Sequence, residues 1–308
     1  MSTLLVTHDD GLNHVTPDGH PERVARLEHL WPALDGKDVV RAECPLATDA
    51  DLTLCHPQDY VTMIREAIPA QGFNQLDGDT WLSSGSYDCA SRAVGGAMLA
   101  VDKVMAGEVK NAFVAMRPPG HHAETATPMG FCLFGTVAIA AKHALDRHGL
   151  SRVAVVDFDV HHGNGSQDLL RGEARALFIS SHQMPLWPGS GAAHETGDHD
   201  NVLNIPLAPG TGGQGFRQEY EGQVFPRLEE FKPEMILISA GFDAHADDPL
   251  ANLNLREDDF AWVTRKLCEI ADRHCDGRVV SSLEGGYDLR ALAASGAVHL
   301  DELIKAGG

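Results

Sequence analysis

An alternation of short apolar runs with helical patterns begins near residue 86 and continues along the chain, and it constrains the fold more than any other feature of the sequence. The apolar runs have the length and composition of buried strands, and the segments between them carry apolar residues at helical spacing. Strands that alternate with helices form a parallel sheet with helices on both faces. We therefore predict a three-layer α/β domain with a mostly parallel β-sheet and a ligand site at the carboxyl ends of its strands.

The predicted elements cover most of the chain. We expect helices at 86–107, 131–148, 216–231, 258–274 and 289–306, and strands at 111–116, 153–160, 175–182, 201–207, 234–241 and 278–286. Before residue 86 the pattern is weaker, with a strand at 4–7, a helix beginning near His20 and another at 57–68. The sequence contains no repeat, linker or low-complexity segment, so we expect residues 1–308 to form one domain.

The charge balance argues against one class of partner. The chain has 24 Lys and Arg against 44 Asp and Glu, a formal net charge of −20, which repels a nucleic-acid backbone and favours cationic substrates. No apolar run approaches the roughly 18 residues that span a bilayer, and the opening MSTLLVTHDD has no basic leader. Six cysteines without a C-x-x-C pair are expected to be reduced. We expect a cytoplasmic protein with no nucleic-acid or membrane partner, and the sequence leaves open whether it forms a homo-oligomer.

Polar side chains follow four of the predicted strands. They are His121 and His122 after the first, Asp157, Asp159, His161 and His162 after the second, Asp243 after the third and Tyr287 after the fourth. Because the carboxyl ends of parallel strands meet at one edge of a sheet, these side chains are expected to gather in one site.

The segment VVDFDVHHGNG indicates a metal site, because buried carboxylates need a positive partner. Asp157, Asp159 and His161 alternate along the chain and therefore share a face of the strand, and Asp243 is the best third ligand. Three protein ligands with an open position are typical of catalytic zinc, although this donor set also suits Fe(II), Co(II) and Mn(II). The spacing does not choose between Asp157 and Asp159, and a buried ion-paired cluster without metal is the alternative interpretation.

Three further residues are suited to acid–base and oxyanion chemistry. His121 and His122 follow two prolines and a glycine that restrict and shape their loop, and they are candidates for general acid and base. Tyr287 follows two glycines that let its loop approach closely, and it is a candidate donor to a developing oxyanion.

Together these segments resemble the arginase–deacetylase superfamily, and within it the class II-like histone deacetylases. The stretches that carry the resemblance run in order from residue 19 to 289 and are GHPERVARL, RPPGHHAETATPMGFC, VVDFDVHHGNGSQ, SSHQMPLWPGSG, NIPLAPGTGG, SAGFDAHADDPLANLNL and LEGGYDL. The resemblance implies zinc-dependent removal of acetyl or other short acyl groups from the ε-amine of lysine.

The resemblance also implies a role for each residue of the site. Asp159, His161 and Asp243 would bind zinc. Asp157 would orient His121 and, with Ser180, bind a structural potassium ion. His122, with Asn164 as its partner, would act as general base and then acid, and Tyr287 would polarise the amide carbonyl. Phe131, Trp187, Gly130 and Leu250 would line the substrate tunnel, and Arg23 would lie near an inner cavity through which acetate leaves.

Other functions fit the sequence less well. An arginase-like ureohydrolase needs a second metal ion, but Gly163 and His245 stand where that branch has aspartates. A non-catalytic acyl-lysine-binding scaffold is expected to have lost a ligand, a tandem histidine or the tyrosine, and all are present. GTGGQG at 210–215 fits a dinucleotide motif, but the acids about 20 residues on, Glu229 and Glu230, fall in a predicted helix, so we predict a tunnel-rim loop.

The physiological substrate is less constrained than the reaction. Related acetylpolyamine deacetylases favour an acid near the tunnel mouth, whereas the position seven residues beyond Asp243 is Leu250, which favours acyl-lysine. The loop acids keep acetylpolyamines as the alternative; they are Asp77, Asp79, Asp247 and Asp248. Other histidines, His148 among them, show no partner pattern and are expected at the surface or at helix caps.

Overall fold

The computed structural model describes residues 2–308. Its centre is an eight-stranded sheet in the order β2-β1-β5-β10-β9-β6-β7-β8, in which every neighbouring pair is parallel. The strands are β1 (Thr3–Thr7), β2 (Val40–Glu43), β5 (Asn111–Val114), β6 (Val153–Asp157), β7 (Ala176–Gln183), β8 (Val202–Leu207), β9 (Met235–Ala240) and β10 (Val279–Leu283). The predicted α/β fold with a parallel sheet is confirmed.

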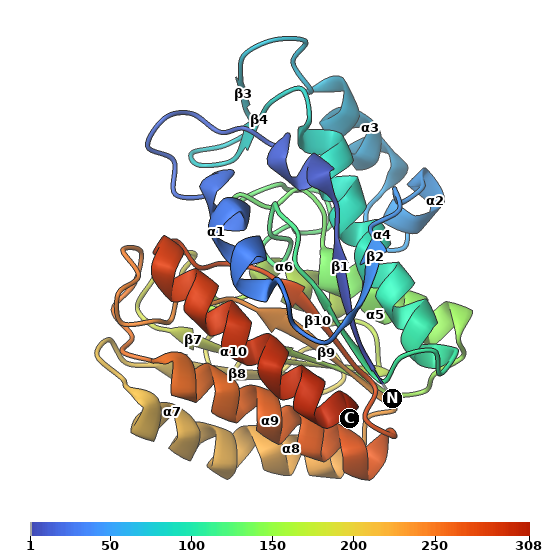
Figure 1. Ribbon diagram of the computed structural model, residues 1–308, viewed down its shortest axis with the longest axis vertical. Coiled ribbons are helices and arrows are strands. Elements are labelled where there is room, and N and C mark those ends of the chain that lie inside the picture. The colour runs from blue at the N-terminus through green and yellow to red at the C-terminus, as the bar shows by residue number, and fades with distance from the viewer. Residues whose placement is uncertain (1) are drawn as a thin grey trace.

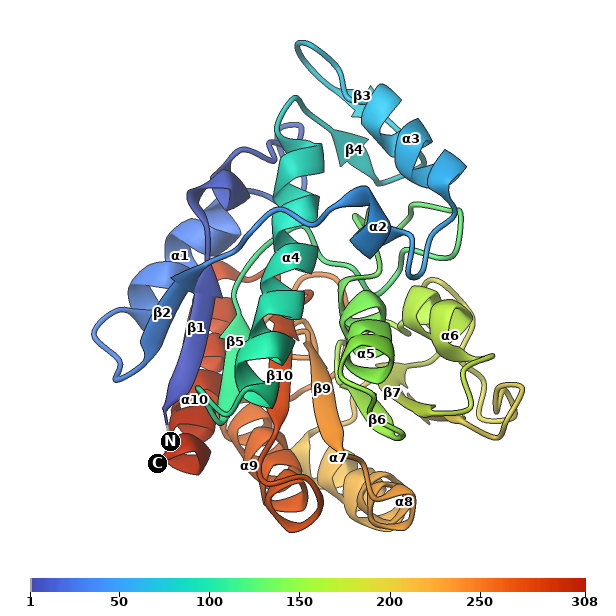
Figure 2. The same cartoon turned by 90° about the vertical axis from the view of Figure 1, so that its right-hand side faces the viewer.

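Helices cover both faces of this sheet (Figures 1 and 2). The α-helices are α1 (Ala25–Leu34), α2 (Asp49–Leu52), α3 (Gln58–Glu66), α4 (Ser86–Met105), α5 (Thr136–Arg147), α6 (Asn164–Leu170), α7 (Gly213–Glu219), α8 (Phe225–Phe231), α9 (Glu257–His274) and α10 (Leu289–Gly307). A 3₁₀ turn η1 (Asp9–Leu12) follows β1, a π-helical turn η2 (Tyr220–Val224) joins α7 to α8, and a small antiparallel pair, β3 (Asn74–Gln75) and β4 (Trp81–Leu82), lies outside the main sheet.

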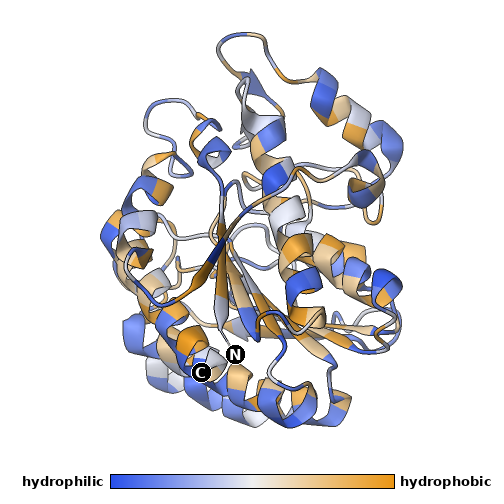
Figure 3. Cartoon of the chain, turned by 45° about the vertical axis from the view of Figure 1, so that its right-hand side comes forward, coloured by the Kyte–Doolittle hydropathy of each residue, from blue (hydrophilic) through white to orange (hydrophobic). Residues whose placement is uncertain are grey.

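Two hydrophobic cores lie on opposite faces of the sheet. Val153 and Val155 of β6 belong to the core that α4 and α5 cover, whereas Ala154 and Val156 belong to the core under α9 and α10. This alternation follows from the two-residue period of a strand, and apolar residues on both faces make the central strands continuously hydrophobic. Figure 3 shows the strands as a hydrophobic centre between helices whose outer faces are hydrophilic.

The sheet places four strand ends side by side. β5, β10, β9 and β6 are its four central strands, and they are the strands after which the sequence places histidines, acids and a tyrosine. Their carboxyl ends lie at the upper side of Figures 1 and 2, near α3 and the β3–β4 pair. None of the helices within residues 2–308 combines the length and apolar character needed to cross a membrane.

Several predicted boundaries are corrected by the structure. The helix expected at 131–148 begins only at Thr136, because residues 131–135 form a loop beside the site. The helix expected at 216–231 is divided by the π-helical turn, and it starts earlier, at Gly213. Strand β2 and helix α6 were not predicted from the sequence.

Candidate active site

Three side chains from two neighbouring strand ends converge on one point. Asp159 and His161 follow β6, and Asp243 follows β9, the next strand in the sheet. One donor atom of each residue lies within 4.8 Å of the corresponding atoms of the other two. His161 Nδ1 lies 3.3 Å from Asp159 Oδ1 and 3.1 Å from Asp243 Oδ2, and all three residues are buried. This arrangement forms a three-ligand group that can surround a single cation.

The electrostatics of the group call for such a cation. Burial and the charge of Asp159 raise the pKa of Asp243 to about 7. Burial alone would lower the pKa of His161, but its hydrogen bonds to the two acids raise that pKa to about 10. Within residues 2–308, no lysine or arginine forms an ion pair with either carboxylate. Two buried carboxylates and an imidazole therefore fit a divalent metal, which would replace the proton that now holds them together.

Backbone glycines form a close cradle around these acids. A Cβ atom at Gly285 would collide with Asp243 Oδ2, and one at Gly241 would collide with Asp159 Oδ2. The N–H group of Gly285 also donates to Asp159 Oδ2 at 2.8 Å, and that of Val160 donates to Asp243 Oδ1 at 2.9 Å. These donors fix the carboxylates in the orientation that turns them toward His161.

The tandem histidines after β5 have opposite electrostatic environments. His121 Nδ1 lies 2.9 Å from Asp157 Oδ2, and although burial would lower its pKa, Asp159 and Asp157 raise it well above the usual value. For His122, burial and the nearby charges of His121 and His161 lower the pKa well below the usual value. The two rings lie 3.8 Å apart between centroids, so the cationic ring helps to keep its neighbour neutral.

The amide partner of His122 determines which ring nitrogen carries the proton. Asn164 Nδ2 donates to Glu124 Oε1 at 2.8 Å, which leaves Asn164 Oδ1 as the acceptor for His122 Nδ1, also at 2.8 Å. The proton of neutral His122 therefore lies on Nδ1, and Nε2 keeps its lone pair. A neutral imidazole with a free Nε2 is suited to accept a proton.

Tyr287 is held at the site by its backbone and its ring. Its N–H group donates to Asp248 Oδ2 at 2.7 Å, and the guanidinium carbon of Arg26 lies 4.9 Å from the ring centroid. The hydroxyl makes no hydrogen bond to any other residue of the described chain. Burial raises the pKa of Tyr287 well above its usual value, so the hydroxyl keeps its proton and can donate it in a hydrogen bond.

A cavity of about 230 Å³ connects these groups to the surface. Its walls are Pro21, Asp79, His122, Gly130, Phe131, His161, Leu186, Trp187, Leu250 and Tyr287. Phe131 has a φ of 68°, a conformation that bulky residues rarely adopt, and its N–H group donates to Thr80 Oγ1 at 3.1 Å. The cavity therefore brings together all four residues that the sequence analysis assigned to a tunnel.

Comparisons with known proteins identify the family of this chain. The histone deacetylase domain model matches residues 20–303. The chain is 39% identical over 298 residues to a probable deacetylase of Archaeoglobus fulgidus, covering 94% of this chain and 82% of the relative. It is 40% identical over 293 residues to a histone deacetylase-like amidohydrolase of Pseudomonas aeruginosa, covering 92% and 77%. The chain belongs to the histone deacetylase family. The crystal structure of the HDA15 HD domain matches 99% of this chain and 89% of its own, with a TM-score of 0.93 and 30% identity.

The arginine expected near the inner end of this histone deacetylase site lies at the surface. Arg23 is exposed and lines a second hollow, whose wall also includes Tyr287 and Arg290. The buried arginine at Tyr287 is instead Arg26, on the first turn of α1, which donates to the carbonyl oxygens of Glu284 and Gly286. Sequence reasoning missed it because Arg23 and Arg26 are three residues apart in HPERVAR, and the sequence does not show that α1 begins between them, at Ala25.

The sequence analysis also missed that two buried acids hold the loops of the site in position. Glu284 Oε2 accepts the N–H groups of Gly120 and His121 at 2.6 and 3.1 Å, so it fixes the histidine loop. Asp248 is buried and accepts three backbone N–H groups, from Leu250, Tyr287 and Asp288. Its carboxylate is therefore engaged in holding loops together. The sequence analysis had named Asp248 as an acid for cationic substrates, and its three backbone bonds give it a structural role instead.

Two alternative functions find less support in the geometry. Gly163 and His245 bring no carboxylate to the three-ligand group, so a second bridged metal lacks its acids. Residues 210–215 lead into α7 and do not line the cavity, which corrects their prediction as a tunnel-rim loop. Glu229 lies in α8 as expected and pairs there with Arg273 and His274.

Proposed function

We propose that this chain, acting as one domain over residues 1–308, hydrolyses the amide bond between a short acyl group, acetyl above all, and the ε-amine of lysine in a protein or peptide. The observation that carries the proposal is that a neutral His122, the hydroxyl-bearing Tyr287 and His161 of the three-ligand group line one cavity of about 230 Å³. Aromatic walls on a narrow cavity suit an uncharged acylated side chain better than a free ammonium group.

The metal assignments follow from the donor sets. We assign Zn²⁺ to Asp159, His161 and Asp243, with Fe²⁺ and Co²⁺ as ions that the same donors suit. We assign a structural K⁺ to Asp157 and Ser180, which are partners in the register between β6 and β7. A divalent ion bound to the three-ligand group supplies Lewis-acid polarisation of the acyl carbonyl and of the attacking water.

The side chains of the chain itself carry the protons. His122 Nε2 accepts a proton from water as the new C–O bond forms at the acyl carbon. The Tyr287 hydroxyl donates a hydrogen bond to the acyl oxygen as negative charge develops there. A histidine of the tandem pair then returns a proton to the lysine nitrogen as the C–N bond breaks, so that a carboxylic acid and a free amine are released.

Two wall residues of the cavity, Leu250 and Asp79, favour different substrates. Leu250 gives the wall an apolar surface where an acid would serve a distant ammonium group, and this favours acyl-lysine. Asp79 is the one carboxylate among the wall residues, and it favours acetylpolyamines as the alternative substrate. Its Oδ1 accepts from Gly130 N and Thr80 Oγ1, which ties it to the wall, and we therefore rank acyl-lysine first.

A comparison of two substrates tests the proposal. We expect a higher kcat/KM for an acetyl-lysine peptide than for an acetylated polyamine, and one divalent ion at the three-ligand group, measured by elemental analysis as the ion that Asp243→Ala loses. Tyr287→Phe is expected to lower kcat at least about a hundredfold while the metal content stays unchanged. A preference for the polyamine would replace the substrate assignment. Metal-loaded protein that turns over neither compound would indicate a non-catalytic scaffold, and loss of two ions per chain in Asp243→Ala would favour a ureohydrolase.

A further inference from the structure

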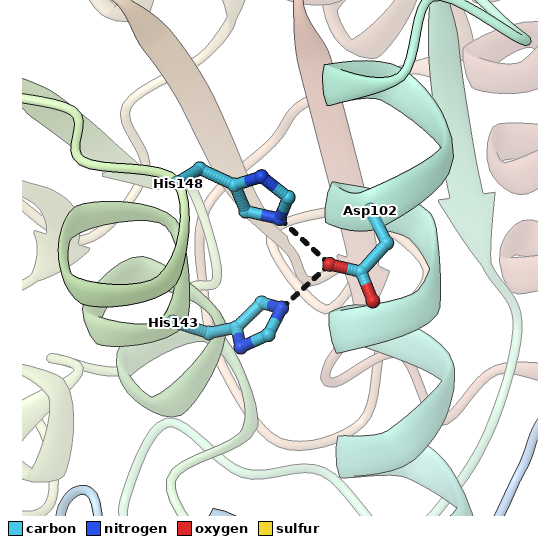
Figure 4. Close-up of side chains that lie close together, drawn as sticks. All are labelled: Asp102, His143 and His148. Atoms are coloured by element: carbon cyan, nitrogen blue, oxygen red, sulfur yellow. Dashed lines mark hydrogen bonds and ion pairs between the residues drawn. The ribbon is translucent and has the colours of Figure 1, made fainter.

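A second cluster of metal-binding side chains lies far from the cavity, between α4 and α5. Figure 4 shows Asp102 of α4 facing His143 of α5 and His148, the residue that caps α5. Asp102 Oδ1 lies 2.7 Å from Nε2 of each histidine, and one donor atom of each residue lies within 4.8 Å of the other two. Both helices end near the amino ends of the strands, at the opposite side of the sheet from the catalytic group (Figure 2).

The cluster contains the donor atoms that transition metals prefer. Two imidazole nitrogens and a carboxylate oxygen are common ligands of Zn²⁺, and tetrahedral coordination at about 2.0–2.2 Å separates such atoms by about 3.4 Å. The 2.7 Å contacts would therefore open by less than 1 Å, which rotation of side chains at the surface allows. Within residues 2–308, Nδ1 of His143 and of His148 makes no hydrogen bond, so each ring is free to carry its proton on Nδ1 when a metal ion takes Nε2.

The charge around Asp102 also favours a cation. No lysine or arginine of the described chain forms an ion pair with its carboxylate, which contacts only the two histidines. Partial burial would raise the pKa of Asp102, but its hydrogen bonds to both histidines lower it, so the group is ionised. Two ring N–H groups now share one carboxylate oxygen, and a single divalent ion can replace both protons.

The two helices hold the three side chains in place. Val101 and Val104 of α4 and Ala144 and Leu145 of α5 are buried in the same hydrophobic core, so the backbones that carry the cluster are fixed relative to each other. The His143 side chain is 11% exposed and the Asp102 side chain 51%, which leaves one side of the cluster open to solvent and to an ion. Rigid elements that present convergent ligands favour metal binding.

We propose that Asp102, His143 and His148 form a surface site for a divalent transition-metal ion, Zn²⁺ in the first place, that is separate from the catalytic group and ties the end of α4 to the end of α5. The site has three protein ligands and a solvent-exposed side where water completes the coordination. It does not depend on the proposed deacetylase activity, because it shares no residue with the cavity.

Equilibrium dialysis of the full chain against Zn²⁺, followed by elemental analysis, tests this site. We expect two zinc ions per wild-type chain, and one in the double variant His143→Ala/His148→Ala. A matched control, His194→Ala/His199→Ala, removes two exposed histidines elsewhere and is expected to keep both ions. Asp243→Ala is expected to lose the catalytic ion and retain the one at the surface.

The outcomes separate the surface site from the catalytic one. If the His143→Ala/His148→Ala variant binds as much zinc as the wild type, the surface site is overturned. The wild type could also bind only one ion, which Asp243→Ala retains and His143→Ala/His148→Ala loses. That result would support the surface site and contradict the catalytic metal assignment. His148→Gln, at the end of the helix, provides a milder variant if the double variant unfolds; it is expected to weaken zinc binding at least about tenfold, and unchanged affinity would contradict the site.

Discussion

At the scale of single residues, the charges around the tandem histidines give the two rings opposite protonation states. His121 and His122 are adjacent, equally buried and of the same type, yet the pKa of the first is raised and that of the second is lowered. The difference follows from the neighbouring charges, because Asp159 and Asp157 raise the pKa of His121. Burial and the charge of His121 lower the pKa of His122, whose own partner is the neutral amide of Asn164. A carboxylate stabilises the imidazolium, whereas an amide orients the ring without adding charge.

Exchanging the amide for a carboxylate should therefore move the pH profile. Asn164→Asp places a negative charge at His122 Nδ1 and is expected to raise the pKa of that histidine by about 1 to 3 units. Because the general base must be neutral, the acidic limb of kcat/KM should move to higher pH by a similar amount. Gln71→Glu makes the same amide-to-acid change at an exposed position and should leave the limb in place. An unchanged limb in Asn164→Asp would contradict the role of His122 as the base.

Gly130 is a position where the cavity has no room for a side chain. A Cβ atom there would lie 2.5 Å from His122 Cδ2 and 2.6 Å from a Trp187 ring carbon, and its φ of 56° favours glycine. We expect Gly130→Ala to lower kcat/KM at least about tenfold, since displacement of catalytic groups by 1 Å can cost about a hundredfold. Gly72→Ala, also at positive φ but with no atom within 4 Å, should leave activity unchanged and so separates backbone strain from obstruction of the cavity.

The sequence identified the types of site residue better than their exact positions. Strand periodicity puts Asp157 and Asp159 on one face, but β6 ends at Asp157, and only the three-dimensional loop turns Asp159 toward His161. Arg23 and Arg26 were likewise indistinguishable until the start of α1 was known. His148 has no partner pattern in the sequence because Asp102 lies 46 residues away and meets it only through the packing of two helices.

At the scale of elements, buried ionic contacts hold together the loops that form the site. Glu22, in the segment before α1, accepts from Arg117 after β5 at 2.6 and 2.5 Å and from Arg26 at 3.2 Å. All three side chains are fully buried. Burial would raise the pKa of Glu22, but Arg117 and His14 lower it well below the usual value, so the carboxylate is ionised.

Removing this charge should destabilise the fold strongly. Glu22→Gln leaves two buried guanidinium groups without their carboxylate, and we expect the free energy of unfolding to fall by about 3–5 kcal/mol. The control Glu108→Gln removes the exposed ion pair with Lys103 and should cost at most about 1 kcal/mol. Urea unfolding followed by circular dichroism measures both. Equal effects of the two variants would show that the buried network adds nothing beyond a surface ion pair.

The elements themselves were predicted where their hydrophobic period is clear. The central strands and the long helices α4, α9 and α10 were located because they bury continuous or periodic apolar residues. β2 was missed because it is a largely exposed edge strand with the sequence VRAE, and α6 because NGSQDLL is short and begins with residues that favour turns. Both elements are defined by their neighbours more than by their own sequences.

At the scale of the whole molecule, burying neutral histidines links the stability of the fold to pH. Burial lowers the pKa of His299 to about 3, and its ring nitrogens lie 2.6 Å from Thr264 Oγ1 and 2.8 Å from Ser281 Oγ, between α10, α9 and β10. In the unfolded chain a histidine takes up a proton below about pH 6.5. Between about pH 6.5 and 3 the unfolded state therefore binds one proton more than the folded state at this residue.

This difference in proton binding makes the free energy of unfolding depend on pH, and replacing His299 should remove that dependence. Over that window His299 should make the free energy of unfolding rise by about 1.4 kcal/mol per pH unit, and the contribution should be constant above about pH 7. His299→Gln cannot titrate, so the difference in unfolding free energy between wild type and variant should grow with pH from 4 to 6 and then level off. Other buried histidines and the metal ligands titrate equally in both proteins and cancel. A difference for His299→Gln that does not vary with pH would show that the ring is not held neutral by the fold.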